Sequence, residues 1–199
     1  MPVIGEIAAI VLAAGASRRF GSDKLLYPTT LHGLTLPLAA HSLLPWLETF
    51  GNATVVVRPE SAAFCTAIET ALGKTIRWAV CKDAARGMSA SIACGISANR
   101  NAAGWLIGLA DMPLVPAVAI SGVKNALLEG ANLAAPFLNG RRGHPVGFAS
   151  FYRDELLALQ GDNGARFLLE REKSNLVQIS IDHHGIFADI DTKEDLQNL

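Results

Sequence analysis

The 199-residue sequence has no bias toward either charge. Its 17 lysines and arginines nearly balance its 18 aspartates and glutamates, so the formal net charge is −1. Proteins that bind nucleic acids usually carry a basic face, and this composition gives no support for such a partner. Any phosphate group that the protein binds must therefore be held by a local cluster of cations.

Cysteines are few and the apolar runs are short. The three cysteines, Cys65, Cys81 and Cys94, have spacings that match no zinc or redox motif. They argue against a disulfide framework and favour a reducing compartment. The apolar run at residues 7–14 is too short to span a bilayer and lacks the basic residues that open a signal peptide. We therefore expect a cytoplasmic protein with no membrane partner.

Short apolar segments alternate with stretches of helical periodicity. Strands that are buried on both faces have continuous apolar sequences, and their alternation with helices predicts an α/β fold. We expect a three-layer α/β/α, Rossmann-like arrangement with a mostly parallel central sheet. The predicted strands are residues 7–12, 53–57, 75–80, 105–109, 134–137, 145–149 and 176–181. The predicted helices are residues 36–50, 61–72, 89–98, 118–129, 152–159 and 165–170, with a final short helix after residue 192.

The first predicted helix carries two local signals. Thr35 has the residue type of a helix N-cap, and Pro45 is expected to kink or end the helix. No repeat or low-complexity linker interrupts the chain. Its length suits one domain with a sizeable core, so we expect residues 1–199 to form a single domain.

Polar residues gather in loops that follow the predicted strands. In parallel sheets the ligand lies beyond the carboxyl ends of the strands, which here places the loops after Leu12, Val80 and Leu109 at one edge. The loop at residues 13–24 is rich in glycine and small residues, which let backbone N–H groups approach an anion. It also contains Arg18, Arg19 and Lys24. The glycine spacing fits neither the dinucleotide-binding nor the P-loop motif, so a phosphate site of another kind is predicted.

The segment from Leu12 to Lys24, LAAGASRRFGSDK, resembles the opening motif of the MobA-like NTP transferases. Within that family it is most similar to the molybdenum cofactor cytidylyltransferase group. Further matches follow in the family's order at residues 87–91, 109–113, 142–146, 161–166 and 189–192. Residues 27–36 depart from the short glycine-rich hairpin that is usual there.

The resemblance implies a nucleotidyltransferase that transfers CMP from CTP to the phosphate of molybdopterin or molybdenum cofactor and releases pyrophosphate. Catalysis would depend on Arg19, Lys24 and Asp111. The residues implied to bind the nucleotide are Leu12, Ala13, Ala14, Gly15, Arg19, Lys24, Ser89 and Ser91. Ser89 and Ser91 are equally suited to cap the helix that follows them.

The resemblance also implies a Mg²⁺ site formed by Asp111 and Asp191. Magnesium prefers oxygen ligands and commonly uses one or two carboxylates together with substrate phosphates. Asp189 is the alternative to Asp191 as the second ligand.

A polar turn at residues 139–144 is the candidate acceptor site. Arg142 would pair with the phosphate of the pterin acceptor, and His144 would orient that acceptor. Residues 161–166 would either close over the acceptor or form a simple turn. The nucleotide half would then cover residues 1–115 and the acceptor half residues 116–199. A molybdoenzyme or its maturation factor would receive the product.

The choice of base depends on Ala14, because the guanylyl relatives usually have glycine at this position. A methyl group there narrows the base pocket and favours the smaller pyrimidine. One alternative is an enzyme of the same fold that uses GTP or a sugar-phosphate acceptor. Another is a non-catalytic nucleotide-binding module, against which the joint presence of Arg19, Lys24, Asp111 and Asp191 argues.

Overall fold

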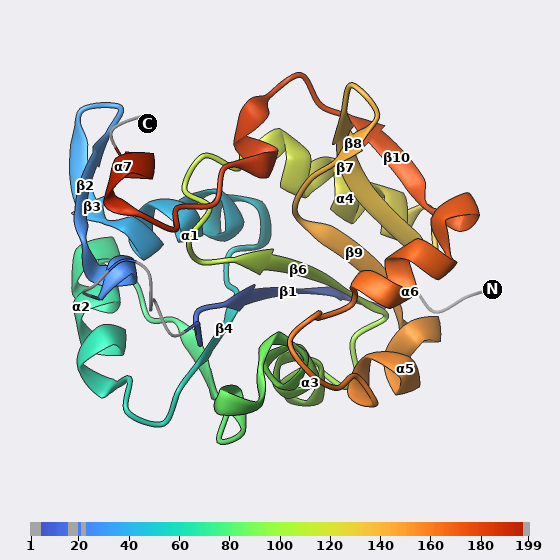
Figure 1. Cartoon of the computed structure of the whole chain (residues 1–199), viewed down its shortest axis with the longest axis horizontal. Helices are drawn as coiled ribbons and strands as arrows, with labels where there is room; N and C mark the ends of the chain where they lie inside the picture. Colours follow the sequence, from blue (N-terminus) through green and yellow to red (C-terminus); the bar gives the residue numbers. More distant parts are fainter. Residues whose placement is uncertain (1–4, 16–19, 21–22, 197–199) are drawn as a thin grey trace.

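The computed structural model describes residues 5–15, 20 and 23–196. An eight-stranded sheet crosses the centre of the molecule (Figure 1), in the order β10-β7-β9-β6-β1-β4-β5, with the short β8 paired to β7. The strands of this sheet are β1 (Ile7–Leu12), β4 (Thr54–Val57), β5 (Arg77–Val80), β6 (Gly104–Leu109), β7 (Leu133–Leu138), β8 (Arg141–Arg142), β9 (Val146–Ala149) and β10 (Val177–Ser180).

The sheet is mostly parallel, as the sequence predicts. Strands β5, β4, β1 and β6 run parallel to one another, and β7 runs parallel to β10. Strand β9 runs antiparallel to both β6 and β7. Leu12 at the end of β1 is in register with Val56 of β4 and Leu109 of β6, so the loops that follow these strands emerge at one edge.

Helices cover both faces of the sheet, which confirms the predicted three-layer arrangement (Figure 1). Alternate residues of β1 point to opposite layers: Val11 belongs to one core cluster, and Ile10 belongs to the other. The first face is covered by α1 (Leu38–Phe50), α2 (Ala62–Leu72) and α4 (Ala117–Leu128). The second is covered by α3 (Met88–Ala98), α5 (Arg153–Leu157) and α6 (Arg166–Arg171). Helix α7 (Lys193–Leu196) follows the last strand.

A β-hairpin lies where the sequence analysis placed the start of the first helix. Strands β2 (Pro28–Leu31) and β3 (Leu34–Pro37) pair antiparallel, and the turn between them is His32-Gly33, with φ of 51° and 78°. Two positive φ values are typical of two-residue hairpin turns and explain the glycine. Thr35 is therefore a strand residue rather than the predicted helix N-cap.

Helix α1 excludes one of the two outcomes expected for Pro45, the end of the helix. The helix continues through this residue to Phe50, so the proline does not end it. Proline removes one N–H from the helical hydrogen-bond ladder. Burial of the helix on the sheet compensates for this loss, since both Leu43 and Trp46 are buried.

Two further observations concern the described residues as a whole. None of the helices in ranges 5–15, 20 and 23–196 is long and apolar enough to cross a membrane. The thiols of Cys65, Cys81 and Cys94 are all free.

Candidate active site

The site lies at the carboxyl edge of the parallel strands. The Ala13 N–H donates to the Val56 carbonyl oxygen at 2.8 Å, and the Ala110 N–H donates to the Leu12 carbonyl oxygen at 3.0 Å. These bonds continue the sheet pairing past the ends of β1 and β6. They fix the starts of the two loops that carry most of the predicted site residues.

The start of the glycine-rich loop is held by an arginine that the sequence analysis missed. The Arg58 Nε donates to the Ala14 carbonyl oxygen at 2.7 Å, and Arg58 directly follows β4. Ala13 and Ala14 are buried, whereas Gly15 is exposed. A charged residue immediately after a continuous apolar strand was the available signal for Arg58. Arg18 and Arg19 lie outside the described residues, so the catalytic and phosphate-binding role of Arg19 stays a prediction.

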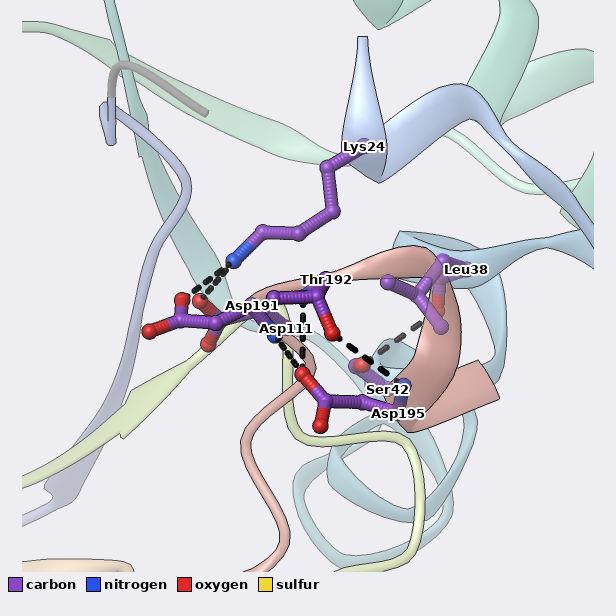
Figure 2. Close-up of polar contacts among 7 residues, drawn as sticks. All are labelled: Lys24, Leu38, Ser42, Asp111, Asp191, Thr192 and Asp195. Carbon is purple, nitrogen blue, oxygen red and sulfur yellow. Dashed lines mark hydrogen bonds and ion pairs between the residues drawn. The ribbon is translucent and has the colours of Figure 1, made fainter. Parts of the chain in front are cut away.

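Three charged side chains converge next to this loop (Figure 2). The Lys24 Nζ donates to Asp111 Oδ2 at 2.8 Å and to Asp191 Oδ1 at 3.2 Å. Lys24 opens a one-turn 3-10 helix, Asp111 lies two residues after β6, and Asp191 lies two residues before α7. The lysine is the most deeply buried, with 7% of its side chain exposed against 25% for Asp111 and 42% for Asp191.

Backbone contacts fix the main-chain segments that carry the two carboxylates. The Ile190 N–H donates to the Asp111 carbonyl oxygen at 3.0 Å, which ties the C-terminal segment to the loop after β6. The N–H groups of Asp191 and Thr192 donate to Asp195 Oδ2 at 2.9 and 2.7 Å. Since these bonds involve the main chain, the positions of Asp111 and Asp191 are set largely by the backbone rather than by Lys24.

Burial and charge act against each other within this cluster. Burial raises the pKa of Asp111, and the attraction and hydrogen bond of Lys24 offset part of that shift. Burial alone would lower the pKa of Lys24, but its contacts with Asp111 and Asp191 raise that pKa above its usual value. Lys24 is therefore a stable cation at neutral pH.

The cluster has the chemistry of a divalent-metal site. Two carboxylates face one cation position, and Asp111 Oδ1 is buried with no hydrogen-bond partner among the described residues. Within ranges 5–15, 20 and 23–196, histidine, cysteine and carboxylate side chains form no metal-binding group of three or more. A metal ion would thus need further oxygen ligands, which substrate phosphates supply.

The geometry also bears on the choice between Asp189 and Asp191. The carboxylate that meets the Lys24 ammonium beside Asp111 is that of Asp191. Asp189 is exposed, and its charge acts on Asp111 only as a smaller influence that raises the pKa of that carboxyl. We therefore retain Asp191 as the proposed second ligand.

A cavity of about 150 Å³ lies beside the ends of β1 and β6. Much of its wall is apolar and comes from both halves of the chain. Four polar or charged residues also line it, namely Arg142, His144, Asn163 and Arg166. The apolar wall is formed by Leu12, Met88, Ile92, Ile107, Leu109, Val146, Phe148, Ala165 and Leu169. The polar turn and the loop at residues 161–166 thus reach the same cavity as the ends of the first and sixth strands.

Close packing holds the turn that carries Arg142 and His144. The Gly143 N–H donates to the Pro136 carbonyl oxygen at 2.8 Å, and the His144 N–H donates to the Ile186 carbonyl oxygen at 2.9 Å. A Cβ on Gly143 would lie 2.6 Å from Ile186 Cγ1 and 2.7 Å from its carbonyl oxygen, so only glycine fits. The positions of both candidate acceptor-binding side chains therefore depend on this glycine.

Arg142 and His144 differ from the charged cluster in having few partners. His144 Nδ1 is buried and accepts or donates no hydrogen bond within the described part of the chain. Burial, with a smaller effect from Arg142, lowers the pKa of His144 to about 4, so its ring is neutral at pH 7. Burial likewise lowers the pKa of Arg142, and the nearby Arg166 lowers it further. The predicted roles of the two residues toward an acceptor stay predictions.

Ser89 and Ser91 are both buried near the start of α3. The helix begins at Met88, with Gly87 as its N-cap, so the alternative reading of the serines as N-caps is wrong. Instead, Ser89 Oγ donates to the Gln160 carbonyl oxygen at 3.1 Å. Their predicted contact with a nucleotide stays a prediction.

The loop after α5 closes on this helix start. The Ser89 N–H donates to the Gly161 carbonyl oxygen at 3.3 Å, and the Met88 N–H donates to Asp162 Oδ1 at 3.1 Å. A carboxylate at a helix N-terminus satisfies a free N–H group and interacts favourably with the helix dipole. Asp162 thus links the second half of the chain to α3, a contact that neither alternative for residues 161–166 predicted.

Comparison with known proteins agrees with this architecture. The family model of the MobA-like NTP transferase domain matches residues 9–176. The chain belongs to this family. It is 31% identical to the purine catabolism protein PucB of Bacillus subtilis strain 168, over 95% of this chain and 93% of PucB. This membership makes the protein a nucleotidyltransferase of the MobA-like kind.

Solved structures share the fold. Rv0371c of Mycobacterium tuberculosis H37Rv superposes with a TM-score of 0.80 at 22% identity, covering 98% of this chain and 96% of that one. The same mycobacterial protein has been solved in complex with manganese, with a TM-score of 0.78. A nucleotidyl transferase from Methanothermobacter thermautotroptrophicus, Mth528, has a TM-score of 0.73 at 20% identity, over 97% of this chain and 95% of that one.

Proposed function

We propose that the protein transfers CMP from CTP to the phosphate of molybdopterin or molybdenum cofactor in a Mg²⁺-dependent reaction that releases pyrophosphate. The observation that carries the catalytic part is the convergence of Lys24, Asp111 and Asp191 on one point at the carboxyl edge of the sheet. A nucleotidyl transfer concentrates negative charge at such a point, and fixed charges placed there lower the barrier.

Positioning supplies much of the catalysis in this proposal. An acceptor phosphate oxygen attacks the α-phosphorus of CTP, and the bond to the pyrophosphate oxygen breaks. Arg19 and Lys24 would neutralise the charge of the departing pyrophosphate. Asp111 and Asp191 would hold the metal ion, which supplies Lewis-acid polarisation of the α-phosphate when bound. The manganese complex of Rv0371c supports a divalent ion in this fold.

The acceptor would bind in the cavity between the two halves of the chain. Leu12 and Leu109 line that cavity, and the loops that directly follow them carry Gly15 and Asp111. An acceptor in the cavity would therefore lie next to the nucleotide. Arg142 would pair with the acceptor phosphate, and the neutral His144 would offer a hydrogen bond without adding charge.

The lining of the cavity favours a heterocycle over a sugar as the acceptor. Sugars are recognised by many hydrogen bonds, whereas flat heterocycles fit apolar walls with a few polar groups. Phe148, Leu169 and Met88 contribute such a wall. A pterin phosphate has the matching combination of a flat ring and an anionic end. The product would pass to a molybdoenzyme or its maturation factor.

The preference for CTP follows from Ala14. Its side chain is buried, and its carbonyl oxygen is held by Arg58, so the methyl group has a fixed position next to the proposed base site. A fixed methyl group excludes part of the volume that a purine occupies.

The test is pyrophosphate release with Mg²⁺, molybdopterin and each of CTP, GTP, ATP and UTP. We expect release that requires both the pterin and CTP. Faster release with GTP would assign the protein to the guanylyl branch of the family. Nucleotide binding without any release, or without dependence on Mg²⁺, would favour a non-catalytic module.

Thermal unfolding with the same nucleotides gives an independent measure of binding. Ligand at about 100 times its Kd adds roughly 2.7 kcal/mol to the free energy of unfolding. For a chain of this length, that corresponds to roughly 5–10 °C in melting temperature. We expect the largest shift with CTP and Mg²⁺ together.

A further inference from the structure

The Lys24 ammonium lies between the two carboxylates proposed to bind the metal ion (Figure 2). It contacts Asp111 Oδ2 at 2.8 Å and Asp191 Oδ1 at 3.2 Å. These two contacts place the ammonium within hydrogen-bond distance of both carboxylates. A divalent ion shared by Asp111 and Asp191 would lie within a few ångströms of the same ammonium, even if it also used the unpartnered Asp111 Oδ1.

Two cations cannot share this position. Like charges a few ångströms apart repel strongly where water is partly excluded, and the lysine side chain here is almost fully buried. One of the two cations must therefore leave when the other arrives. An ammonium group on a four-carbon stem has the freedom to move away.

The carboxylates are less free to move. The Asp111 main chain is bonded to Ile190, and the main chain before α7 is held by the Asp195 carboxylate. The Lys24 side chain bonds only to Asp111 and Asp191 in the described part of the chain. The lysine is thus the element of the cluster that gives way.

We propose that Lys24 is the resident cation of the metal site, and that the arriving divalent ion displaces its ammonium toward the triphosphate. The inference rests on the proposed function, because it takes Asp111 and Asp191 as the metal ligands. Metal ion alone binds weakly to the resting protein, since it must break two ion pairs. Metal ion and nucleotide bind together well, because the released ammonium gains new phosphate partners.

The experiment measures Mn²⁺ binding without nucleotide, using electron paramagnetic resonance of the free ion. It compares the unmodified protein with Lys24→Met and Lys193→Met. Lys193 is an exposed lysine two residues after Asp191, so its variant removes the same charge nearby without emptying the position between the carboxylates. We expect Lys24→Met to bind Mn²⁺ roughly tenfold more tightly than the unmodified protein, and Lys193→Met to stay within about twofold.

Equal or weaker Mn²⁺ binding by Lys24→Met would overturn the exchange. An equal gain of Mn²⁺ affinity in Lys24→Met and Lys193→Met would also contradict the displacement of Lys24, because that result would reflect net charge alone. Lys24→Gln keeps a polar side chain and serves if Lys24→Met does not fold, as judged by its melting temperature. The same order of affinities is expected for Lys24→Gln.

The failure of this inference is distinguishable from the failure of the proposed function. Lys24→Met could bind Mn²⁺ more tightly although the unmodified protein releases no pyrophosphate with any nucleotide. That result would support the displacement of Lys24 by the metal ion and contradict the proposed nucleotidyl transfer. Pyrophosphate release by the unmodified protein, with no gain of Mn²⁺ affinity in Lys24→Met, would support the proposed nucleotidyl transfer and contradict the displacement of Lys24.

Discussion

The charged cluster and the cavity lined by Arg142 and His144 lie at the same edge of the sheet, yet they differ in how their charged groups are paired. In the cluster, Lys24 neutralises two carboxylates from within the protein. In the cavity, His144 Nδ1 has no partner in the described part of the chain, and Arg142 faces another cation, Arg166. Buried polar groups without partners cost stability. The difference indicates that the charges of the cluster are largely balanced at rest, although Asp111 Oδ1 has no partner in the described part of the chain, whereas the cavity lacks partners for His144 and Arg142.

The largest effect is expected in the cluster. Asp111→Asn removes the charge of a proposed metal ligand but keeps the shape of the side chain, so pyrophosphate release should fall on the order of 10²–10³-fold while the fold is retained. The matched control is Asp189→Asn, an exposed carboxylate two residues from Asp191. It should keep most of the activity. A greater loss in Asp189→Asn than in Asp191→Asn would exchange the roles assigned to these two residues.

The next effect concerns His144 and acid pH. The pKa of this residue is about 4 in the folded protein, against an ordinary value of 6.5. Between these values the unfolded chain binds the additional proton, so stability falls as the pH drops from 6.5 toward 4. His144→Gln should show a shallower fall, with a difference on the order of 1–2 kcal/mol at pH 5 relative to pH 7.5.

Chemical denaturation at the two pH values measures that difference. The exposed His184 provides the control, since His184→Gln should retain the pH dependence of the unmodified protein. The prediction fails if His144→Gln and His184→Gln give the same slope of stability against pH.

A smaller effect is expected from Arg142. Arg142→Ala should raise the KM for the pterin phosphate about tenfold, because a charge-assisted contact is lost, and should leave the KM for CTP unchanged. Arg141→Ala is the matched control, since Arg141 is exposed and lies over the Phe187 ring. Steady-state kinetics with each substrate varied in turn would separate the two constants. A rise in the KM for CTP instead would move Arg142 out of the acceptor site.

The smallest effect is expected at the link between the two halves of the chain. Asp162→Ala removes the acceptor of the Met88 N–H and should lower the free energy of unfolding by about 0.5–1 kcal/mol. Both KM values should rise by a few fold, because Met88 and Asn163 line the cavity. Denaturant unfolding and kinetics on Asp162→Ala, with exposed Asp182→Ala as the control, would test it. No change in either KM would confine Asp162 to a structural role.

The apolar pattern of the sequence was sufficient to predict the central strands of the sheet. The strand predicted at residues 7–12 matches β1, because a strand buried on both faces needs a continuous apolar run. The antiparallel direction of β9 was not predictable, since an apolar run carries no information on direction. The hairpin was missed because Thr35 has the residue type of a helix N-cap, whereas His32-Gly33 was the signal for the hairpin turn.

The candidate site was likewise only partly predictable from the sequence. Family motifs predicted Lys24 as a site residue and grouped Asp111 with Asp191, but the ion pairs between Lys24 and both aspartates could not be predicted, because Lys24 and Asp191 are 167 residues apart. Arg58 and Asp162 were missed for a related reason. Each acts through a backbone group in a loop distant in sequence, and only the folded chain brings these groups together.

Ile190 packs beside Phe20 and Leu38. The time that the C-terminal segment stays docked there sets how long Asp191 remains beside Asp111. A small apolar cluster, the hydrogen bond from Ile190 to Asp111 and the ion pair between Lys24 and Asp191 contribute to this anchor, and we expect it to open more readily than the central sheet. Amide hydrogens near Ile190 should then exchange faster than those of β1. Each such opening would carry Asp191 away from Asp111, which makes the lifetime of the docked tail an upper bound on how long the protein can retain a metal ion that both carboxylates share.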